Sequence, residues 1–176
     1  NLGGGIPSLL QHLAALGNES IAFLGGQSGV RQTTERLKAY RATLEALGLP
    51  ANEQLVALSN YYSQDGYEGM KTLLSCGKRI DAVLAINDQV AIGAIRAACD
   101  AGLRVPEDIS VVGYDGLAIG GYYCPKLTTI TQSLDRLAQR SFEILMACVE
   151  NGAPAKHITV PFTLSCRESV RNLAKE

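Results

Sequence analysis

The stretch from residue 79 to residue 115 constrains the fold more than any other part of the chain. It contains two short, mostly apolar runs, at 80–86 and 109–114, separated by a segment with helical character that ends at Gly102. Apolar runs of this length are typical of strands buried on both faces, and one helix between two such strands joins them in parallel. The sequence therefore predicts a strand–helix–strand unit of an α/β protein.

Polar residues stand where each of these two strands ends. Asn87 and Asp88 follow the first strand, and Asp115 ends the second. Either Asn87 or Asp88 is expected to cap the helix, because a side-chain oxygen can accept the unpaired N–H groups of the first turn. Ligands of open α/β sheets bind outside the carboxyl ends of the strands, so these side chains mark a candidate binding edge.

The same alternation of strand and helix extends to both sides of this unit. Before it, the predicted elements are a helix at 6–16, a strand at 20–24, a helix ending near 47, a strand at 55–58 and a helix at 64–76. After it come a strand at 127–131, a long helix from Ser133 to Asn151, and a last strand at 158–164. Pro161 cannot donate to a ladder, so that last strand is expected to lie at an edge of the sheet or to be partly unpaired. The order predicts a doubly wound parallel sheet with helices on both faces.

Length, charge and cysteine usage narrow the class of protein. A chain of 176 residues can bury a core as one domain or slightly more. The net charge of −1 gives no electrostatic reason for this chain itself to bind nucleic acid, and no apolar run is long enough for a membrane span. Five scattered cysteines form neither a disulfide framework nor a zinc site, which favours a reducing cytoplasm. Because the chain begins at Asn1 without an initiator Met, it is expected to be part of a longer protein.

The sequence does not support catalysis or a bound cofactor or metal. The glycine loop at 25–29 follows a strand, but it matches neither dinucleotide- nor P-loop spacing, so a tight turn is favoured over a nucleotide site. A nucleophile needs a nearby base, and neither His12 nor His157 stands at the carboxyl end of a strand. Asp88 and Asp115 could do acid–base chemistry, although Asp88 is equally well explained as a helix cap.

Four residues instead form a candidate binding constellation. Arg36, Tyr61, Asn87 and Asp115 all lie in connections at the carboxyl side of successive strands. Arg, Asn and Asp can bind adjacent hydroxyls of a neutral polyol such as a sugar, and Tyr can cover its C–H face. The alternative is that Arg36 forms a surface ion pair with a residue such as Glu35, while Asn87 merely caps its helix.

Several motifs resemble the effector-binding core of the lactose/galactose repressor (LacI/GalR) family of bacterial transcription regulators. They are I-A-F-L-G-G at 21–26, A-I-N-D-Q-V-A-I-G-A at 85–94, G-L-R-V-P-E-D-I-S-V-V-G-Y-D at 102–115, and P-x-L-T-T-I at 125–130. The likeness extends over essentially the whole chain.

The resemblance implies a particular division of the chain. Residues 1–131 resemble the C-terminal lobe of a periplasmic-binding-protein-like core of type I, and 132–157 a crossover helix of the N-terminal lobe. Residues 158–176 resemble the final strand and tail that return to the C-terminal lobe. The DNA-binding headpiece, the hinge and most of the N-terminal lobe are expected to lie outside this chain, so operator DNA would be bound only through the headpiece.

The resemblance also assigns roles to single residues. Arg36, Asn87 and Asp115 match positions that bind effector hydroxyls, Tyr61 an aromatic position against the sugar ring, and Gln132 a crossover position near the cleft. The chain departs from the family at Gly116, where a second Asp is frequent. The resemblance implies that this chain lacks a carboxylate beside the site, a change expected to alter the effector or the loop.

The resulting hypothesis is the regulatory domain of a cytoplasmic, sugar-responsive transcription regulator that acts as a homodimer or larger assembly. The helix after Asp88, with Ala91, Ile92, Ile95 and Cys99 on one face, resembles part of the family's dimer surface, but it equally fits burial against the sheet. One rival is a periplasmic or transport-linked sugar-binding protein of the same fold. Another is an α/β enzyme that acts on a sugar or nucleotide.

Overall fold

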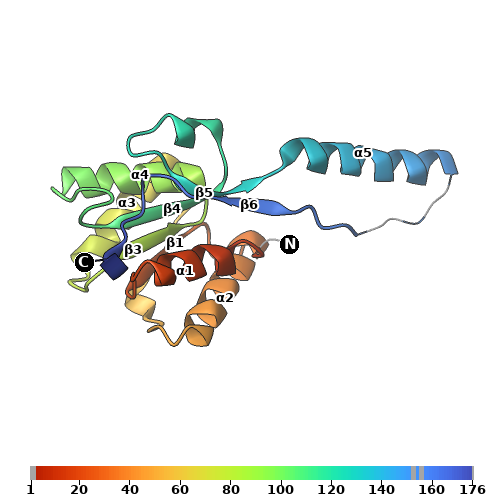
Figure 1. Ribbon diagram of the computed structural model, residues 1–176. Coiled ribbons are helices and arrows are strands. Elements are labelled where there is room, and N and C mark those ends of the chain that lie inside the picture. Colours follow the sequence, from red (N-terminus) through yellow and green to blue (C-terminus); the bar gives the residue numbers. More distant parts are fainter. Residues whose placement is uncertain (1–2, 152–153, 155–156, 176) are drawn as a thin grey trace.

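The computed structural model describes residues 3–151, 154 and 157–175, which form a sheet flanked by helices (Figure 1). The helices are α1 (Ile6–Ala15), α2 (Arg31–Ala46), α3 (Ser63–Ser75), α4 (Asp88–Asp100) and α5 (Leu134–Asn151). The strands are β1 (Ile21–Gly25), β2 (Val56–Leu58), β3 (Ala82–Ala85), β4 (Ser110–Asp115), β5 (Thr128–Gln132) and β6 (Phe162–Ser165). Three short 3₁₀ helices lie at Glu53–Leu55, Ala118–Gly121 and Leu173–Lys175. The predicted alternation of strands and helices is confirmed.

The sheet has the order β2-β1-β3-β4-β5-β6, and every neighbouring pair is parallel except β5 with β6. The chain leaves β1 toward β2 on one side and later enters β3 on the other side of β1. This reversal between β1 and β3 is the point at which α/β sheets of this order bind ligands, outside the strand carboxyl ends. The predicted doubly wound α/β fold is therefore present.

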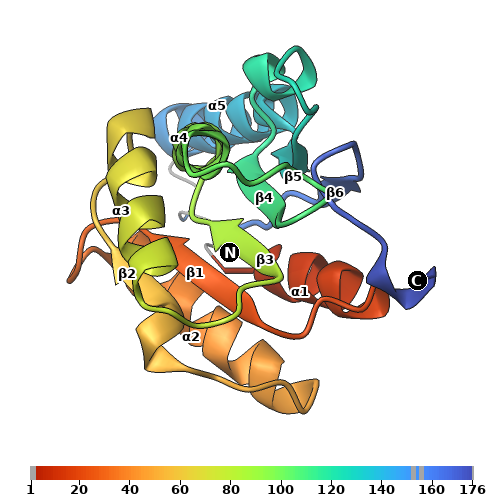
Figure 2. The same ribbon diagram turned by 90° about the vertical axis from the view of Figure 1, so that its left-hand side faces the viewer.

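Helices α1 and α2 cover one face of the sheet and α3 and α4 the other (Figure 2), and a hydrophobic core lies on each face. Side chains alternate along each strand, so Ala22 and Leu24 pack toward α3 and α4, while Ile21 and Phe23 pack toward α1 and α2. All four are fully buried. A sheet covered on both faces needs apolar residues at successive positions, which is why its strands read as continuous apolar runs.

The helix α4 begins where the sequence indicates, but only one of the two predicted caps is used. The Oδ1 of Asn87 accepts a 2.8 Å hydrogen bond from the backbone N–H of Val90. Asp88 is the first residue of the helix and turns its carboxylate away from it. The face formed by Ala91 and Ile95 is buried in the core, whereas Cys99 is exposed.

The last helix, α5, extends away from the sheet (Figure 1). The chain then returns to form β6, which pairs antiparallel with β5 at the edge of the sheet. The strand starts at Phe162, directly after Pro161, and is shorter than the predicted 158–164 because Pro161 has no N–H to donate. Across the part of the chain that the structure describes, no helix is both long and apolar enough to cross a membrane.

Candidate functional site

The five predicted site residues all lie at the carboxyl edge of the sheet. Asp115 is the last residue of β4, Gln132 is the last residue of β5, and Asn87 follows β3. Arg36 is in the second turn of α2, and Tyr61 lies in the connection from β2 to α3. Within this edge they form two groups.

The first group joins Arg36, Asp115 and Gln132. The guanidinium of Arg36 lies 3.6 Å from Oδ1 of Asp115, and Gln132 Nε2 donates a 2.9 Å hydrogen bond to the same oxygen. Arg36 is only 2% exposed, whereas Asp115 is 33% exposed. A surface ion pair of Arg36 with Glu35 is therefore the wrong interpretation, since Arg36 points inward to the end of β4.

Packing around Arg36 explains how a cation is kept at this depth. Its guanidinium lies 3.7 Å from the ring centroid of Tyr114, and it donates to the backbone carbonyl of Ile86. A cation over an aromatic face gains electrostatic attraction that partly replaces lost hydration. Burial lowers the pKa of Arg36, while Asp115 raises it. An arginine stays protonated at physiological pH, so the pair presents opposite charges side by side.

Both the burial of the Asp115 carboxyl group and the backbone conformation of this residue are unfavourable. Burial raises the pKa of its carboxyl, opposed by Arg36 and Gln132, and its backbone φ is 117°, which side-chain-bearing residues rarely adopt. Such conformations cost roughly 1–3 kcal/mol and gather at functional sites, where surrounding contacts hold them. The next residue, Gly116, also has positive φ (75°), and a Cβ there would lie 2.6 Å from Cα of Thr131. Gly116, which stands where the resemblance implies a second Asp, therefore lies at a turn of the backbone that leaves no room for a side chain.

The second group joins Asn87 and Tyr61. While Oδ1 of Asn87 caps α4, its Nδ2 donates a 3.0 Å hydrogen bond to the carbonyl of Tyr61. The hydroxyls of Tyr61 and Thr33 lie 2.8 Å apart. Asn87 therefore does cap its helix, as the alternative interpretation held, and it also ties that helix to the Tyr61 connection.

The glycine loop after β1 makes room for Tyr61. A Cβ on Gly26 would overlap the Tyr61 ring, so the absence of a side chain lets the ring lie against the backbone. This close approach is a physical reason for glycine at a strand end. It links the 25–29 loop to the candidate site without a phosphate-binding geometry.

A cavity of about 280 Å³ opens beside the first group. Its lining includes Gln32, Arg36, Tyr114, Gln132, Ser133 and Phe162. Arg36 and Gln132 line it directly, and Asp115 contacts both of them. Tyr61 and Asn87 do not line this cavity; they belong to the second group at the same edge of the sheet.

Gln32, Tyr114 and Ser133 line the cavity without being predicted site residues, although the sequence carries a signal for each. Gln32 stands four residues before Arg36 on α2 and so shares its helix face. Tyr114 and Ser133 directly precede or follow residues already singled out. Their roles depend on which strand faces α2, and the spacing of the sequence does not contain that information.

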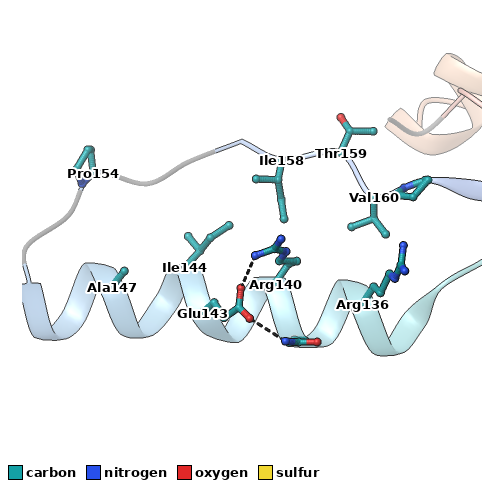
Figure 3. A pocket seen from close by; sticks show the side chains of 11 residues that line it. Arg136, Arg140, Glu143, Ile144, Ala147, Pro154, Ile158, Thr159 and Val160 are labelled. Atoms are coloured by element: carbon teal, nitrogen blue, oxygen red, sulfur yellow. Dashed lines mark hydrogen bonds and ion pairs between the residues drawn. The ribbon is translucent and has the colours of Figure 1, made fainter.

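A larger groove, of about 900 Å³, separates α5 from the segment leading into β6 (Figure 3). Ile144, Ile158 and Val160 line it together with the arginines of α5. Arg140 there pairs with Glu143 at 2.8 Å. Within residues 3–151, 154 and 157–175, no group of three or more His, Cys, Asp or Glu side chains is arranged to hold a metal ion.

Comparison with known proteins places these features in a family. Residues 10–170 match the periplasmic binding protein-like domain. The chain is 36% identical over 138 residues to the HTH-type transcriptional regulator MalR of Clostridium butyricum, covering 78% of this chain and 41% of MalR. It is 32% identical over 168 residues to the HTH-type transcriptional repressor PurR of Actinobacillus pleuropneumoniae, covering 94% of this chain and 50% of PurR. The chain thus spans about half the length of these curated relatives.

Solved structures of regulators are similar over almost the whole chain. A sugar-binding transcriptional regulator of the LacI family from Escherichia coli, complexed with phosphate, superposes with a TM-score of 0.90 at 30% identity, covering 97% of this chain and 62% of that one. The lac repressor dimer bound to operator and the anti-inducer ONPF gives a TM-score of 0.89 at 31% identity, covering 97% and 59%.

Proposed function

The chain belongs to the periplasmic binding protein-like domain family, among the LacI-type transcriptional regulators, and from that premise we propose that it is the effector-binding regulatory part of a bacterial transcription regulator. The relatives are regulators rather than enzymes, which favours a binding role over turnover. They also favour a regulator over the transport-linked alternative. The regulatory role implies a cytoplasmic protein.

The observation that carries the proposal is the contact of Arg36 and Gln132 with Asp115 beside the 280 Å³ cavity. A cation, a carboxylate and an amide at one strand edge supply donors and acceptors for adjacent hydroxyls of a small neutral ligand. A sugar or a related polyol is therefore the effector class that we propose. Tyr61 and Asn87 would complete the site at its other end.

The arrangement of the last helix supports a two-lobe protein. We divide the chain into a C-terminal lobe at 1–131, a crossover helix of the partner lobe at 132–157, and a returning strand and tail at 158–176. Leu137, Phe142, Leu145 and Val149 of α5 are exposed, although side chains of this kind are normally covered. A partner lobe over α5 and the groove of Figure 3 would cover them and provide the second wall of the cleft.

Ligand binding between two lobes would control operator affinity through a shift between two states. Such a shift requires the effector to bind one lobe arrangement more tightly than the other. Operator DNA would be bound by the part of the relatives' length that this chain does not match, in a homodimer or larger assembly. Neither step needs a cofactor.

Calorimetric titration of the longer protein that contains this chain tests the proposal, with a panel of mono- and disaccharides and nucleosides as probes. Operator-fragment binding is measured with and without each probe that binds. We expect binding without product formation and a change in DNA affinity. Conversion of a probe to product, or binding that leaves DNA affinity unchanged, would overturn the regulatory role.

A further inference from the structure

Asp88 is a fully buried carboxylate that none of the roles described so far requires. It does not cap α4, because Asn87 does so. Burial raises the pKa of its carboxyl, and the hydroxyl of Thr129 and the N–H of Leu117 oppose that shift. Burial of an ionisable group costs free energy unless neighbouring groups form hydrogen bonds or ion pairs with it.

Each carboxylate oxygen of Asp88 accepts a hydrogen bond from a different segment of the chain. The Thr129 hydroxyl of β5 donates to Oδ1 at 2.5 Å, and the backbone N–H of Leu117 donates to Oδ2 at 2.6 Å. Short bonds to a carboxylate are among the stronger hydrogen bonds in proteins. The start of α4, the middle of β5 and the chain just beyond β4 are thus joined at one side chain.

The neighbouring strand is shaped to admit this carboxylate. A Cβ on Gly113 of β4 would overlap Oδ1 of Asp88, so glycine at that position leaves the space that Asp88 fills. Two residues further along β4 stands Asp115, whose φ of 117° and whose neighbour Gly116 at 75° form a sharp corner. Leu117, which Asp88 holds, is the residue that leaves this corner.

We infer that Asp88 is a positioning residue for Asp115: by fixing Leu117 against β5, it holds the strained corner that aims the Asp115 carboxylate at Arg36 and Gln132. The corner is restrained on its other side by the pairing of Asp115 with Thr131 between β4 and β5. With both ends held, the unfavourable φ of Asp115 persists. The effect of Asp88 on effector binding rests on the proposed function, whereas its positioning of Asp115 does not.

NMR of the isotopically labelled protein without any ligand tests the inference. The readouts are the side-chain amide signal of Gln132, the carboxyl-carbon signal of Asp115 and the exchange rate of the Leu117 amide. In Asp88→Ala we expect the first two signals to move and the Leu117 exchange to rise roughly tenfold or more, as a local opening would cause. Asp88→Asn should restore all three, since its amide oxygen still accepts from Leu117 and its Nδ2 can donate to Thr129.

Asp81 offers a matched control. It is also a buried carboxylate, and it accepts the N–H groups of Glu19 and Ser20 at 3.1 and 2.9 Å, at the opposite end of β3. Asp81→Ala should lower stability without moving the Gln132 or Asp115 signals. Equal movement in Asp81→Ala, or no movement in a folded Asp88→Ala, would overturn the inference.

Thr129→Val decides the question if Asp88→Ala does not fold. It removes the bond that fixes Oδ1 of Asp88 but leaves the carboxylate in place, so we expect a roughly threefold or greater rise in Leu117 exchange and a shift of the Gln132 signal. Unchanged signals in Thr129→Val would then refute the positioning role. Because no effector is used, failure to find an effector leaves this result intact and bears only on the proposed function.

Discussion

Gln132 donates its 2.9 Å hydrogen bond to Oδ1 of Asp115, the same oxygen that faces the guanidinium of Arg36 at 3.6 Å. One carboxylate oxygen from the end of β4 is therefore shared by side chains from β5 and α2. Since Asp115 remains a third exposed, it can exchange part of this contact for a ligand hydroxyl.

Loss of either partner of the Arg36–Asp115 pair should strongly weaken the effector response while the fold is retained. In Arg36→Ala, or in Asp115→Ala, a charged hydrogen-bonding partner is lost, which is worth about 1.5–3 kcal/mol, or roughly 10–100-fold in effector affinity. Titration of the longer protein with its effector measures the response. Circular dichroism checks that the fold is retained. Arg41→Ala is the matched control, because Arg41 lies on the same helix but pairs with Glu53 at the surface. An unchanged titration in both site variants would show that Arg36 and Asp115 do not bind the effector.

Gly26→Ala should displace Tyr61. The added methyl would overlap the tyrosine ring, and overpacking of this kind destabilises by about 1–3 kcal/mol. We expect a lower midpoint of urea unfolding and weaker effector binding. In Gly121→Ala the new Cβ meets nothing within 4 Å, so that variant should behave as wild type. A Gly26 variant with wild-type stability and affinity would contradict the placement of Tyr61.

Asp88 should make stability fall with rising pH over part of the acidic range. Its pKa in the folded protein lies above the ordinary value of 3.8, so between those two values the folded state binds more protons than the unfolded chain. The free energy of unfolding therefore decreases as the pH rises through that window. Asp88→Asn cannot titrate and should remove this slope.

Urea unfolding of both proteins from about pH 4 to pH 7 checks this prediction. Burial also raises the pKa of Asp115, and the charge of Asp115 raises the pKa of Asp88, so the difference between the two curves reports Asp88 together with its coupling to Asp115. Parallel curves would show that Asp88 does not titrate as its burial requires.

The isolated 176-residue chain should bind the effector more weakly than a longer protein that supplies the partner lobe. The lining of the cavity beside Arg36 also includes Leu137 and residues 158–162, which provide few polar side chains. Ligand sites normally bury most of the ligand surface, so one wall alone gives only part of the affinity. Isothermal titration of both proteins with the same effector is the measurement, and equal affinities would refute the two-lobe arrangement.

The local elements were predictable because their signals are local. The apolar runs, the Asn87 cap and the glycines after α1, α2 and α4 follow from burial periodicity and first-turn hydrogen bonding. The strand β6 begins at Phe162, four residues later than its apolar residues predict, because Pro161 has no N–H to donate to the ladder. The cavity residues Gln32 and Tyr114 were missed because their importance arises from a neighbour distant in sequence.

The sequence alone determined an α/β protein with polar residues at the carboxyl edge of a parallel sheet, because strand and helix periods and capping preferences act over a few residues. Tertiary structure decided that Arg36 turns inward to Asp115 and not to Glu35, and that Asp88 crosses to Thr129 and Leu117 and does not cap its helix. Those choices depend on which strands become neighbours and on how deeply a charge is buried. Both are properties of the packed sheet, and the strand–helix–strand motif at 79–115 acquires its function only within it.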